Sequence, residues 1–216
     1  MNVIFDIGKV LIDFDFEGFA RRILGDEEVS QNVIDAMWNS GDWNELDRGV
    51  LSDEEVLGRF IAHAPRYERE IRLVFSKIAQ CPGKRESTIP IIQTLKGLGH
   101  GVYFLSNYFY FLLHSAPEAL DFTEYMDGGI FSCTVKITKP DKRIYQLLCE
   151  RYGLLPSECV FIDDTLKNVE AARSLGMRGI HYTGQDKDTL LKQILNQHFS
   201  LRRQMVCRRN FLLQCY

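Results

Sequence analysis

Five short apolar runs, separated mostly by helical patterns, restrict most strongly how this 216-residue chain can fold. The runs are Val3–Phe5, Val102–Leu105, Gly129–Phe131, Val160–Ile162 and Gly179–Tyr182. The helical patterns between them cover residues 87–98, 141–152 and 168–175, and each ends at a glycine. Strands that alternate with helices in this way are typical of a parallel sheet that is covered on both faces. We therefore expect an α/β fold with a Rossmann-like parallel sheet.

The stretch from residue 16 to residue 84 interrupts this alternation with helix after helix. The expected helices are Gly18–Leu24, Ser30–Asn39, Ser52–Ala64 and Tyr67–Ala79. Ser52 and Glu55 have the spacing of a capping box at the start of the third helix. We expect a Rossmann-like core at residues 1–15 and 85–198, with a helical domain inserted at residues 16–84. Residues 199–216 contain four arginines and no acidic residue, and we leave this tail unassigned.

Composition is that of a soluble globular protein, with 45% apolar and 25% charged residues. A net charge of −3 argues against a nucleic-acid partner, which needs a concentrated basic surface. No apolar stretch approaches the ~20 residues of a membrane-spanning helix. The N-terminus shows no basic segment followed by a long apolar run, so we expect no signal peptide. Six scattered cysteines without a CxxC pair indicate reduced thiols. We expect a cytoplasmic monomer or small homo-oligomer without a membrane partner.

Polar side chains stand at the ends of the apolar runs. They are Asp6 after the first run, Ser106 and Asn107 after the second, Lys139 beyond the third, and Asp163 and Asp164 after the fourth. Ligands of open parallel sheets bind beyond the carboxyl ends of the strands. Each residue alone has an ordinary explanation as a cap, a turn or a solvated side chain. Independent caps, however, have no reason to occur at every strand end.

This set of residue types suits phosphoryl transfer. A carboxylate can attack phosphorus when a cation offsets the negative charge of the substrate. Oxygen ligands gathered around one point suit Mg²⁺, and a hydroxyl and a lysine can hold the remaining phosphoryl oxygens as charge builds in the transition state.

Four segments resemble, in order and spacing, the motifs of the haloacid dehalogenase (HAD) superfamily. They are Phe5-Asp6-Ile7-Gly8, Leu105-Ser106-Asn107, Lys139-Pro140-Asp141 and Phe161-Ile162-Asp163-Asp164. The resemblance extends from about residue 1 to residue 195, and the helical insert looks like the C1-type cap of that superfamily. Among its branches, the sequence is most similar to the one around α-D-glucose-1-phosphate phosphatase.

The resemblance implies a role for each residue of the motifs. Asp6 would be the nucleophile that forms an aspartyl-phosphate, and it would also bind Mg²⁺. The backbone carbonyl of Gly8 and the carboxylate of Asp164 would complete the metal site, and Asp163 would reach the metal directly or through water.

The other motif residues would bind the phosphate. Ser106 would hydrogen-bond the phosphoryl group, Asn107 would contact substrate or phosphate, and Lys139 would neutralise both Asp6 and the phosphate. The implied function is Mg²⁺-dependent hydrolysis of a small phosphomonoester, with sugar phosphates as the leading class.

One position departs from the pattern of many phosphatases in the superfamily. They place an acid–base Asp two residues after the nucleophile, whereas this chain has Gly8. A positioned acid or base contributes about 10²–10⁴-fold, and a leaving group of low pKa depends on it least. Candidate substitutes are Asp13, Asp15, a cap carboxylate such as Glu45, or water.

Alternatives therefore stay open. One is a 2-haloacid dehalogenase. Asp163 and Asp164 argue against it, because a dehalogenase needs no metal and this pair would bind one. The other is a non-catalytic phosphate-binding or interaction protein. Outside the motifs, Asn168 is interpreted as a helix-capping residue, and Trp38 and Trp43 as core of the helical domain.

Overall fold

The computed structural model describes residues 1–197 and contains a five-stranded parallel sheet. The strands are β1 (Asn2–Phe5), β4 (Gly101–Ser106), β5 (Gly128–Phe131), β6 (Cys159–Asp163) and β7 (Arg178–His181). Their order is β5-β4-β1-β6-β7, so β1 lies at the centre. The predicted parallel α/β sheet is confirmed, and every strand end lies within one residue of its predicted position.

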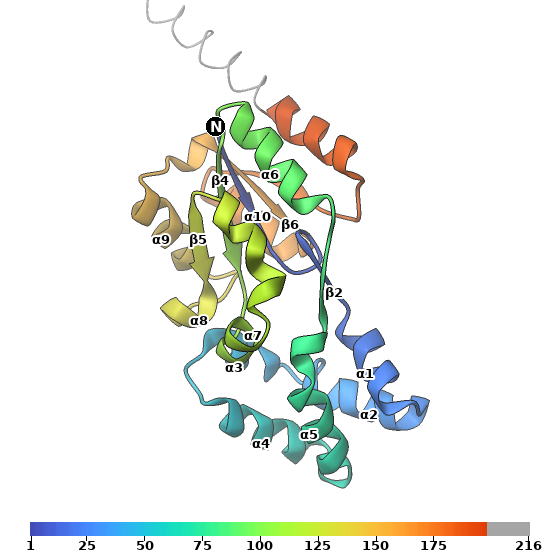
Figure 1. The fold of residues 1–216 in the computed structure, drawn as a ribbon. Coiled ribbons are helices and arrows are strands. Elements are labelled where there is room, and N and C mark those ends of the chain that lie inside the picture. Colours follow the sequence, from blue (N-terminus) through green and yellow to red (C-terminus); the bar gives the residue numbers. More distant parts are fainter. Residues whose placement is uncertain (198–216) are drawn as a thin grey trace, which may run out of the picture.

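Helices cover both faces of the sheet because successive residues of a buried strand point to opposite sides. Val3 and Phe5 of β1 belong to one buried cluster and Ile4 to another. Helix α6 (Thr88–Gly97) and the helical residues 187–197 contribute to the first cluster. Helices α9 (Lys142–Tyr152) and α10 (Leu166–Ser174) contribute to the second and lie on the opposite face in Figure 1. The remaining helical segments beside the sheet are α7 (Tyr110–Ser115), η3 (Pro117–Tyr125), α8 (Ser132–Val135) and η4 (Pro156–Glu158).

Residues between two short strands, β2 (Ile12–Phe14) and β3 (Pro82–Lys84), form a separate group of helices, which we call the helical unit. Its members are α1 (Phe16–Leu24), α2 (Glu27–Met37), α3 (Trp43–Arg48), α4 (Asp53–His63), η1 (Pro65–Tyr67), α5 (Glu68–Ser76) and η2 (Ile78–Gln80). The predicted capping box of Ser52 and Glu55 is confirmed at α4, whereas α3 is a helix that the sequence did not predict. Because β2 and β3 pair antiparallel, the two chain crossings between sheet and helical unit are tied together.

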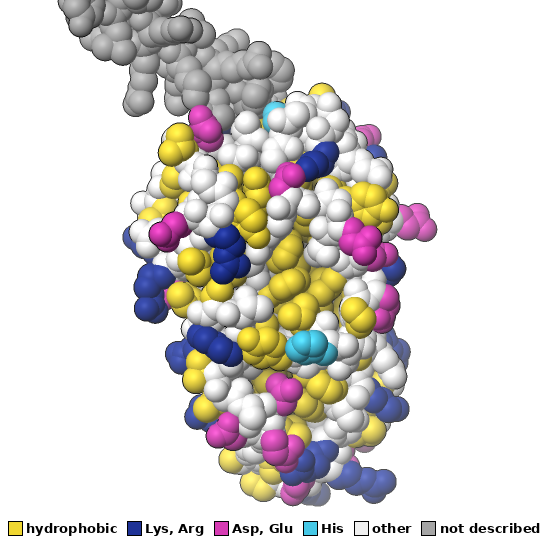
Figure 2. All heavy atoms as spheres, turned by 60° about the vertical axis from the view of Figure 1, so that its left-hand side comes forward, with side chains coloured by type: hydrophobic (Ala, Val, Ile, Leu, Met, Phe, Trp, Pro, Cys, Tyr) yellow, Lys and Arg dark blue, Asp and Glu magenta, His cyan; other side chains and the backbone are white. Residues whose placement is uncertain are grey.

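The carboxyl ends of the sheet strands face the helical unit (Figure 1). Strands β2 and β3 lie at the predicted boundaries of the insert, and the division into core and cap stays a prediction. The unassigned tail, 199–216, falls outside the described residues. On the face shown in Figure 2, hydrophobic side chains gather in a central band and Lys and Arg are dispersed. Among residues 1–197, no helix combines the length and apolar character that crossing a membrane requires.

Candidate active site

Strand register brings the carboxyl ends of three neighbouring strands together. Phe5, the last residue of β1, pairs with Ile162 of β6. Asp6 follows directly, and its backbone N–H donates a hydrogen bond to the carbonyl of Ile162 at 2.8 Å. Asp163 ends β6 and Ser106 ends β4, on the two sides of β1. Three of the predicted site residues therefore meet at one edge of the sheet.

A buried lysine joins two of the carboxylates. Lys139 has only 4% of its surface exposed, and its Nζ lies 2.7 Å from Oδ1 of Asp6 and 2.7 Å from Oδ2 of Asp163. Burial alone would lower the pKa of Lys139, but the facing carboxylates of Asp163 and Asp6 raise it above its ordinary value. Lys139 is thus a fixed cation at the edge of the sheet.

Asp6 keeps one carboxylate oxygen available. Its Oδ1 accepts hydrogen bonds from the backbone N–H of Ile7 at 2.8 Å and from Lys139. Its Oδ2 has no hydrogen-bond partner in the described part of the chain. Burial raises the pKa of Asp6 to about 7; Lys139 opposes this shift, and Asp163 and Asp164 add to it. Oδ2 is therefore the oxygen that a ligand can reach.

Whereas Asp6 keeps 8% of its surface exposed, Asp163 is fully buried. Besides Lys139, its oxygens accept hydrogen bonds from the backbone N–H of Thr165 at 2.8 Å and from Nδ2 of Asn168 at 3.0 and 3.1 Å. The interpretation of Asn168 as a helix cap was wrong, because its amide binds Asp163 and not the backbone of its own helix. A buried carboxylate left short of donors costs more than an uncapped helix end on which water can bind.

The three carboxylates at this edge fit a divalent cation. One oxygen each of Asp6, Asp163 and Asp164 lies within 4.8 Å of the others. Only one buried lysine faces these three acids in the described part of the chain. The pKa of Asp164 is raised, first by burial and second by the negative charge of Asp163. Hard oxygen donors with excess negative charge are what Mg²⁺ prefers. Gly8 lines the same cavity, and the metal-binding role of its carbonyl stays a prediction.

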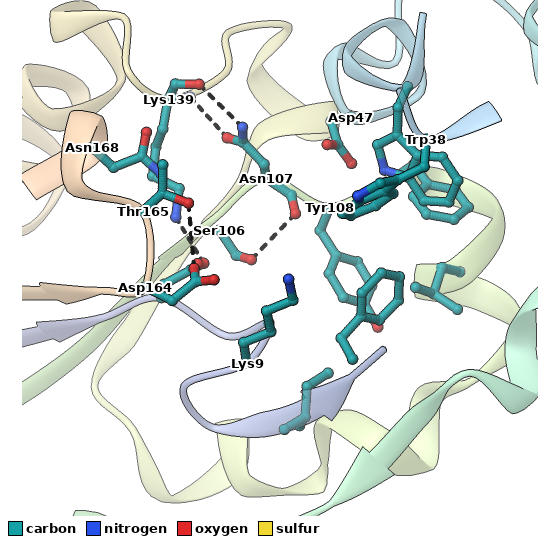
Figure 3. Close-up of a pocket in the computed structure, with 17 residues that line it drawn as sticks. Lys9, Trp38, Asp47, Ser106, Asn107, Tyr108, Lys139, Asp164, Thr165 and Asn168 are labelled. Atoms are coloured by element: carbon teal, nitrogen blue, oxygen red, sulfur yellow. Dashed lines mark hydrogen bonds and ion pairs between the residues drawn. The ribbon is translucent and has the colours of Figure 1, made fainter. Parts of the chain in front are cut away.

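The second motif contributes a hydroxyl and an amide. Ser106 is buried and is one of the residues that line the cavity. The side chain of Asn107 is bound at both ends to Lys139: Oδ1 accepts from its backbone N–H at 2.8 Å, and Nδ2 donates to its carbonyl at 3.1 Å (Figure 3). Asn107 therefore positions Lys139, and its direct contact with substrate stays a prediction.

The cavity above these residues has a volume of about 240 Å³ and an apolar wall opposite the acids. The wall consists of Ile12, Phe14, Trp38, Trp43, Phe109 and Leu112. The rings of Trp38 and Trp43 pack edge to face at 4.7 Å, so both tryptophans belong to the packing of the helical unit and also line the cavity. Lys9 points into the cavity in Figure 3, with its Nζ 5.8 Å from the ring centre of Trp38.

Asp47, at the end of α3, is a cavity residue that the sequence did not predict. It is half-buried, and its carboxylate has no hydrogen bond or ion pair within residues 1–197. Burial raises the pKa of Asp47 to about 7, with Lys139 opposing and Asp6 reinforcing the shift. The sequence offers no separate signal for it, because Asp47 enters the site only through the placement of the helical unit over the sheet.

Comparisons with known proteins identify the family of this chain. A family model of haloacid dehalogenase-like hydrolases matches residues 1–176. The chain is 27% identical over 180 residues to the sesquiterpene phosphatase astK of Aspergillus oryzae, covering 83% of this chain and 88% of that protein. It is also 27% identical over 211 residues to a D-ribitol-5-phosphate phosphatase of Bacteroides thetaiotaomicron, covering 90% and 98%. An (S)-2-haloacid dehalogenase of Burkholderia cepacia is also similar, with 31% identity over 94 residues, which cover 44% of this chain and 41% of that protein.

A solved structure shares the fold. It is a HAD family enzyme of Bacteroides thetaiotaomicron in complex with magnesium and inorganic phosphate, with a TM-score of 0.65 at 20% identity. The match covers 88% of this chain and 98% of that one. The resemblance drawn from the four motifs is confirmed: the chain belongs to the haloacid dehalogenase-like hydrolase family.

Proposed function

We propose that this protein is a Mg²⁺-dependent phosphatase that hydrolyses a small phosphomonoester through an aspartyl-phosphate at Asp6. One observation carries the proposal: within residues 1–197, one carboxylate oxygen of Asp6 has no hydrogen-bond partner, and a buried lysine holds the other. A nucleophilic carboxylate needs this combination of a fixed orientation, a nearby positive charge and an accessible oxygen.

Asp6, Asp164 and the backbone carbonyl of Gly8 would hold the metal, with Asp163 behind them. A bound divalent cation would offset the charge of the phosphate, which otherwise opposes the approach of a carboxylate. The ammonium of Lys139 and the hydroxyl of Ser106 would bind the phosphoryl oxygens and stabilise the charge that grows on them in the transition state.

The reaction would proceed in two displacements. Asp6 attacks phosphorus with its free oxygen, and the bond between phosphorus and the leaving oxygen breaks. Water then attacks the phosphorus of the aspartyl-phosphate, which restores the carboxylate of Asp6 and releases inorganic phosphate. The helical unit would limit the access of water during the first displacement.

The cavity supports a small organic phosphate as substrate. Its aromatic wall suits the face of a sugar ring or an apolar group, and the two relatives are named for a ribitol phosphate and for sesquiterpenes. Sugar phosphates remain the first class to test because of the resemblance to the glucose-1-phosphate phosphatase branch. A panel should contain prenyl phosphates as well.

Hydrolysis of p-nitrophenyl phosphate tests the proposal with Mg²⁺, with EDTA and with the variant Asp6→Asn. We expect Mg²⁺-dependent release of nitrophenol and a loss of at least about 10³-fold in kcat for Asp6→Asn. Asp35→Asn is the matched control, because Asp35 is exposed on α2 away from the cavity. Activity that survives Asp6→Asn would contradict the proposal. An inactive wild-type protein would also contradict the proposal. The next measurements would then be halide release from 2-haloacids and the binding of inorganic phosphate.

A further inference from the structure

The reaction proposed above still lacks a proton donor for the leaving group. A side chain at position 8 would not be excluded by space, because a Cβ there meets no atom within 4 Å, and Gly8 is not among the glycines with positive φ. Packing therefore does not require glycine at position 8, and the absence of a carboxylate there changes the chemistry of the site. A group elsewhere in the cavity must do this work if alcohols of high pKa are to leave.

The three carboxylates that the sequence suggested are engaged elsewhere. Asp13 is mostly exposed and lies 2.6 Å from Nε of Arg85. Asp15 caps α1 by accepting a hydrogen bond from a backbone N–H of its first turn at 3.0 Å. Glu45 lies 3.4 Å from Arg48 on its own helix. None of the three lines the cavity beside Asp6.

We propose that Asp47 is the general acid and base of this active site, supplied by the helical unit in place of a carboxylate at position 8. This assignment rests on the phosphatase function proposed above. Asp47 lines the cavity, and its carboxylate has no partner in the described chain. In Figure 3 it lies beside Trp38 and across the cavity from Asp164, the side on which a leaving group would sit when the phosphate occupies the metal edge.

The backbone that carries Asp47 is fixed against the sheet. Oγ of Ser132, which is fully buried, donates a hydrogen bond to the carbonyl of Asp47 at 2.5 Å. Two residues on, the carbonyl of Gly49 accepts a hydrogen bond from Nζ of Lys136, and Gly49 packs against Cys133. Placement of Asp47 therefore depends on contact between α3 and α8, as expected of a group that a cap delivers on closing.

The surroundings of Asp47 suit a group that changes protonation near neutral pH. Burial raises its pKa to about 7, and the other charged or titratable groups that act on it are Lys139, Asp6 and Cys133. A catalytic acid or base works best when its pKa lies near the working pH.

The proton balance closes over the two displacements. In the first, the bond from phosphorus to the leaving oxygen breaks, and that oxygen takes both the electron pair and the proton of the Asp47 carboxyl, so a neutral alcohol leaves. In the second, the Asp47 carboxylate removes a proton from the attacking water. The oxygen of this water forms a bond to phosphorus while the bond from phosphorus to the Asp6 oxygen breaks. Asp47 is protonated again, Asp6 is restored as a carboxylate, and phosphate is released.

Two substrates of nearly equal shape test the proposal: p-nitrophenyl phosphate and p-nitrobenzyl phosphate. Nitrophenolate leaves without a proton, whereas benzyl alkoxide does not. We expect Asp47→Asn to lower kcat on the benzyl ester by about 10²-fold or more, and on the phenyl ester by less than about tenfold. Glu45→Gln is the control, because Glu45 shares the helix but does not line the cavity.

The double variant Gly8→Asp/Asp47→Asn adds a rescue. Because position 8 has space for a side chain, we expect it to regain at least tenfold of the activity lost on the benzyl ester. The phenyl ester reports in each preparation that the protein is folded and that Asp6 is active.

Three results would overturn the assignment. Equal losses on both esters with a raised KM would make Asp47 a substrate-binding group. No loss on the benzyl ester, or a wild type that hydrolyses only the phenyl ester, would show that Asp47 donates no proton. A wild type inactive on both esters would instead refute the phosphatase function on which the assignment rests.

Discussion

At the scale of single residues, the site depends on how Lys139 is held. Its side chain is fixed by Asp6 and Asp163, and its backbone by both ends of the Asn107 amide. Asn168 in turn supplies donors to Asp163. The lysine thus has little freedom to move away from the oxygen that it must neutralise, which is the kind of preorganisation on which electrostatic catalysis rests.

Replacing Asn107 by Ala should therefore lower kcat with little change in KM. Both backbone hydrogen bonds to Lys139 are lost, and small misplacements of a catalytic group cost about tenfold to hundredfold in rate. Steady-state kinetics on p-nitrophenyl phosphate measure this, with the exposed Asn39→Ala as control. A rise in KM alone would instead favour the role predicted from the sequence, direct contact of Asn107 with the substrate.

The motif residues could be placed from the sequence because parallel strands end at a common edge, which puts Asp6, Ser106 and Asp163 together without further information. Asn168 and Asp47 could not. The choice of Asn168 between its own helix and a buried carboxylate depends on tertiary packing. The position of Asp47 depends on how the helical unit sits over the sheet, which no local pattern reports.

At the scale of elements, the contact of α3 with α8 joins the helical unit to the sheet at the site. Gly49 ends α3 with φ of 62°, and a Cβ there would lie 2.9 Å from Cβ of Cys133. Such a distance requires one of the two elements to move. Glycine is therefore needed at this position for both its backbone conformation and its lack of a side chain.

Gly49→Ala should move α3 outward, with a strain of about 1–2 kcal/mol from the left-handed backbone. We expect a lower Tm and a greater loss of activity on p-nitrobenzyl than on p-nitrophenyl phosphate, because Asp47 moves with α3. Gly58→Ala is the matched control: it lies inside α4 with no atom within 4 Å of a new Cβ, so alanine should stabilise this helix by about 0.5–1 kcal/mol. Equal behaviour of the two variants would exclude this role of the contact.

The elements that could be predicted from the sequence are those that are long or have clear capping residues. The long helices that carry glycine stops or a capping box were predicted, and so were all five strands of the sheet. Helix α3 was not, since its six residues show no complete apolar period. Strands β2 and β3 have three residues each and are defined only by pairing with each other across the insert.

At the scale of the whole molecule, the site lies where two structural units meet, and its acids are held there at a cost in stability. A carboxylate that no partner neutralises destabilises the fold when it is charged. Asp47 is such a group, since its carboxylate has no hydrogen bond or ion pair in the described residues. A substitution that removes this charge should therefore raise the stability of the protein and lower its activity.

Asp47→Asn should stabilise the metal-free protein at alkaline pH. The pKa of Asp47 is raised to about 7 in the folded state, against about 3.9 in an unfolded chain. A raised folded pKa means that stability is fully present below the unfolded pKa and is lost as the pH rises through the folded one. The asparagine variant does not titrate, so the difference should be small at pH 4. The full shift would correspond to about 4 kcal/mol at pH 8, and because Asp47 is only half-buried and water screens its charge, we expect about 1–3 kcal/mol there.

Urea unfolding at both pH values, in EDTA and without phosphate, measures this difference. Asp35→Asn, at an exposed position on α2, is the control for the substitution itself. If Asp47→Asn destabilises the protein equally at pH 4 and pH 8, then the carboxyl of Asp47 is a structural hydrogen-bonding group. A gain confined to alkaline pH, together with the loss on the benzyl ester, would mean that the same buried charge weakens the fold and supplies the proton.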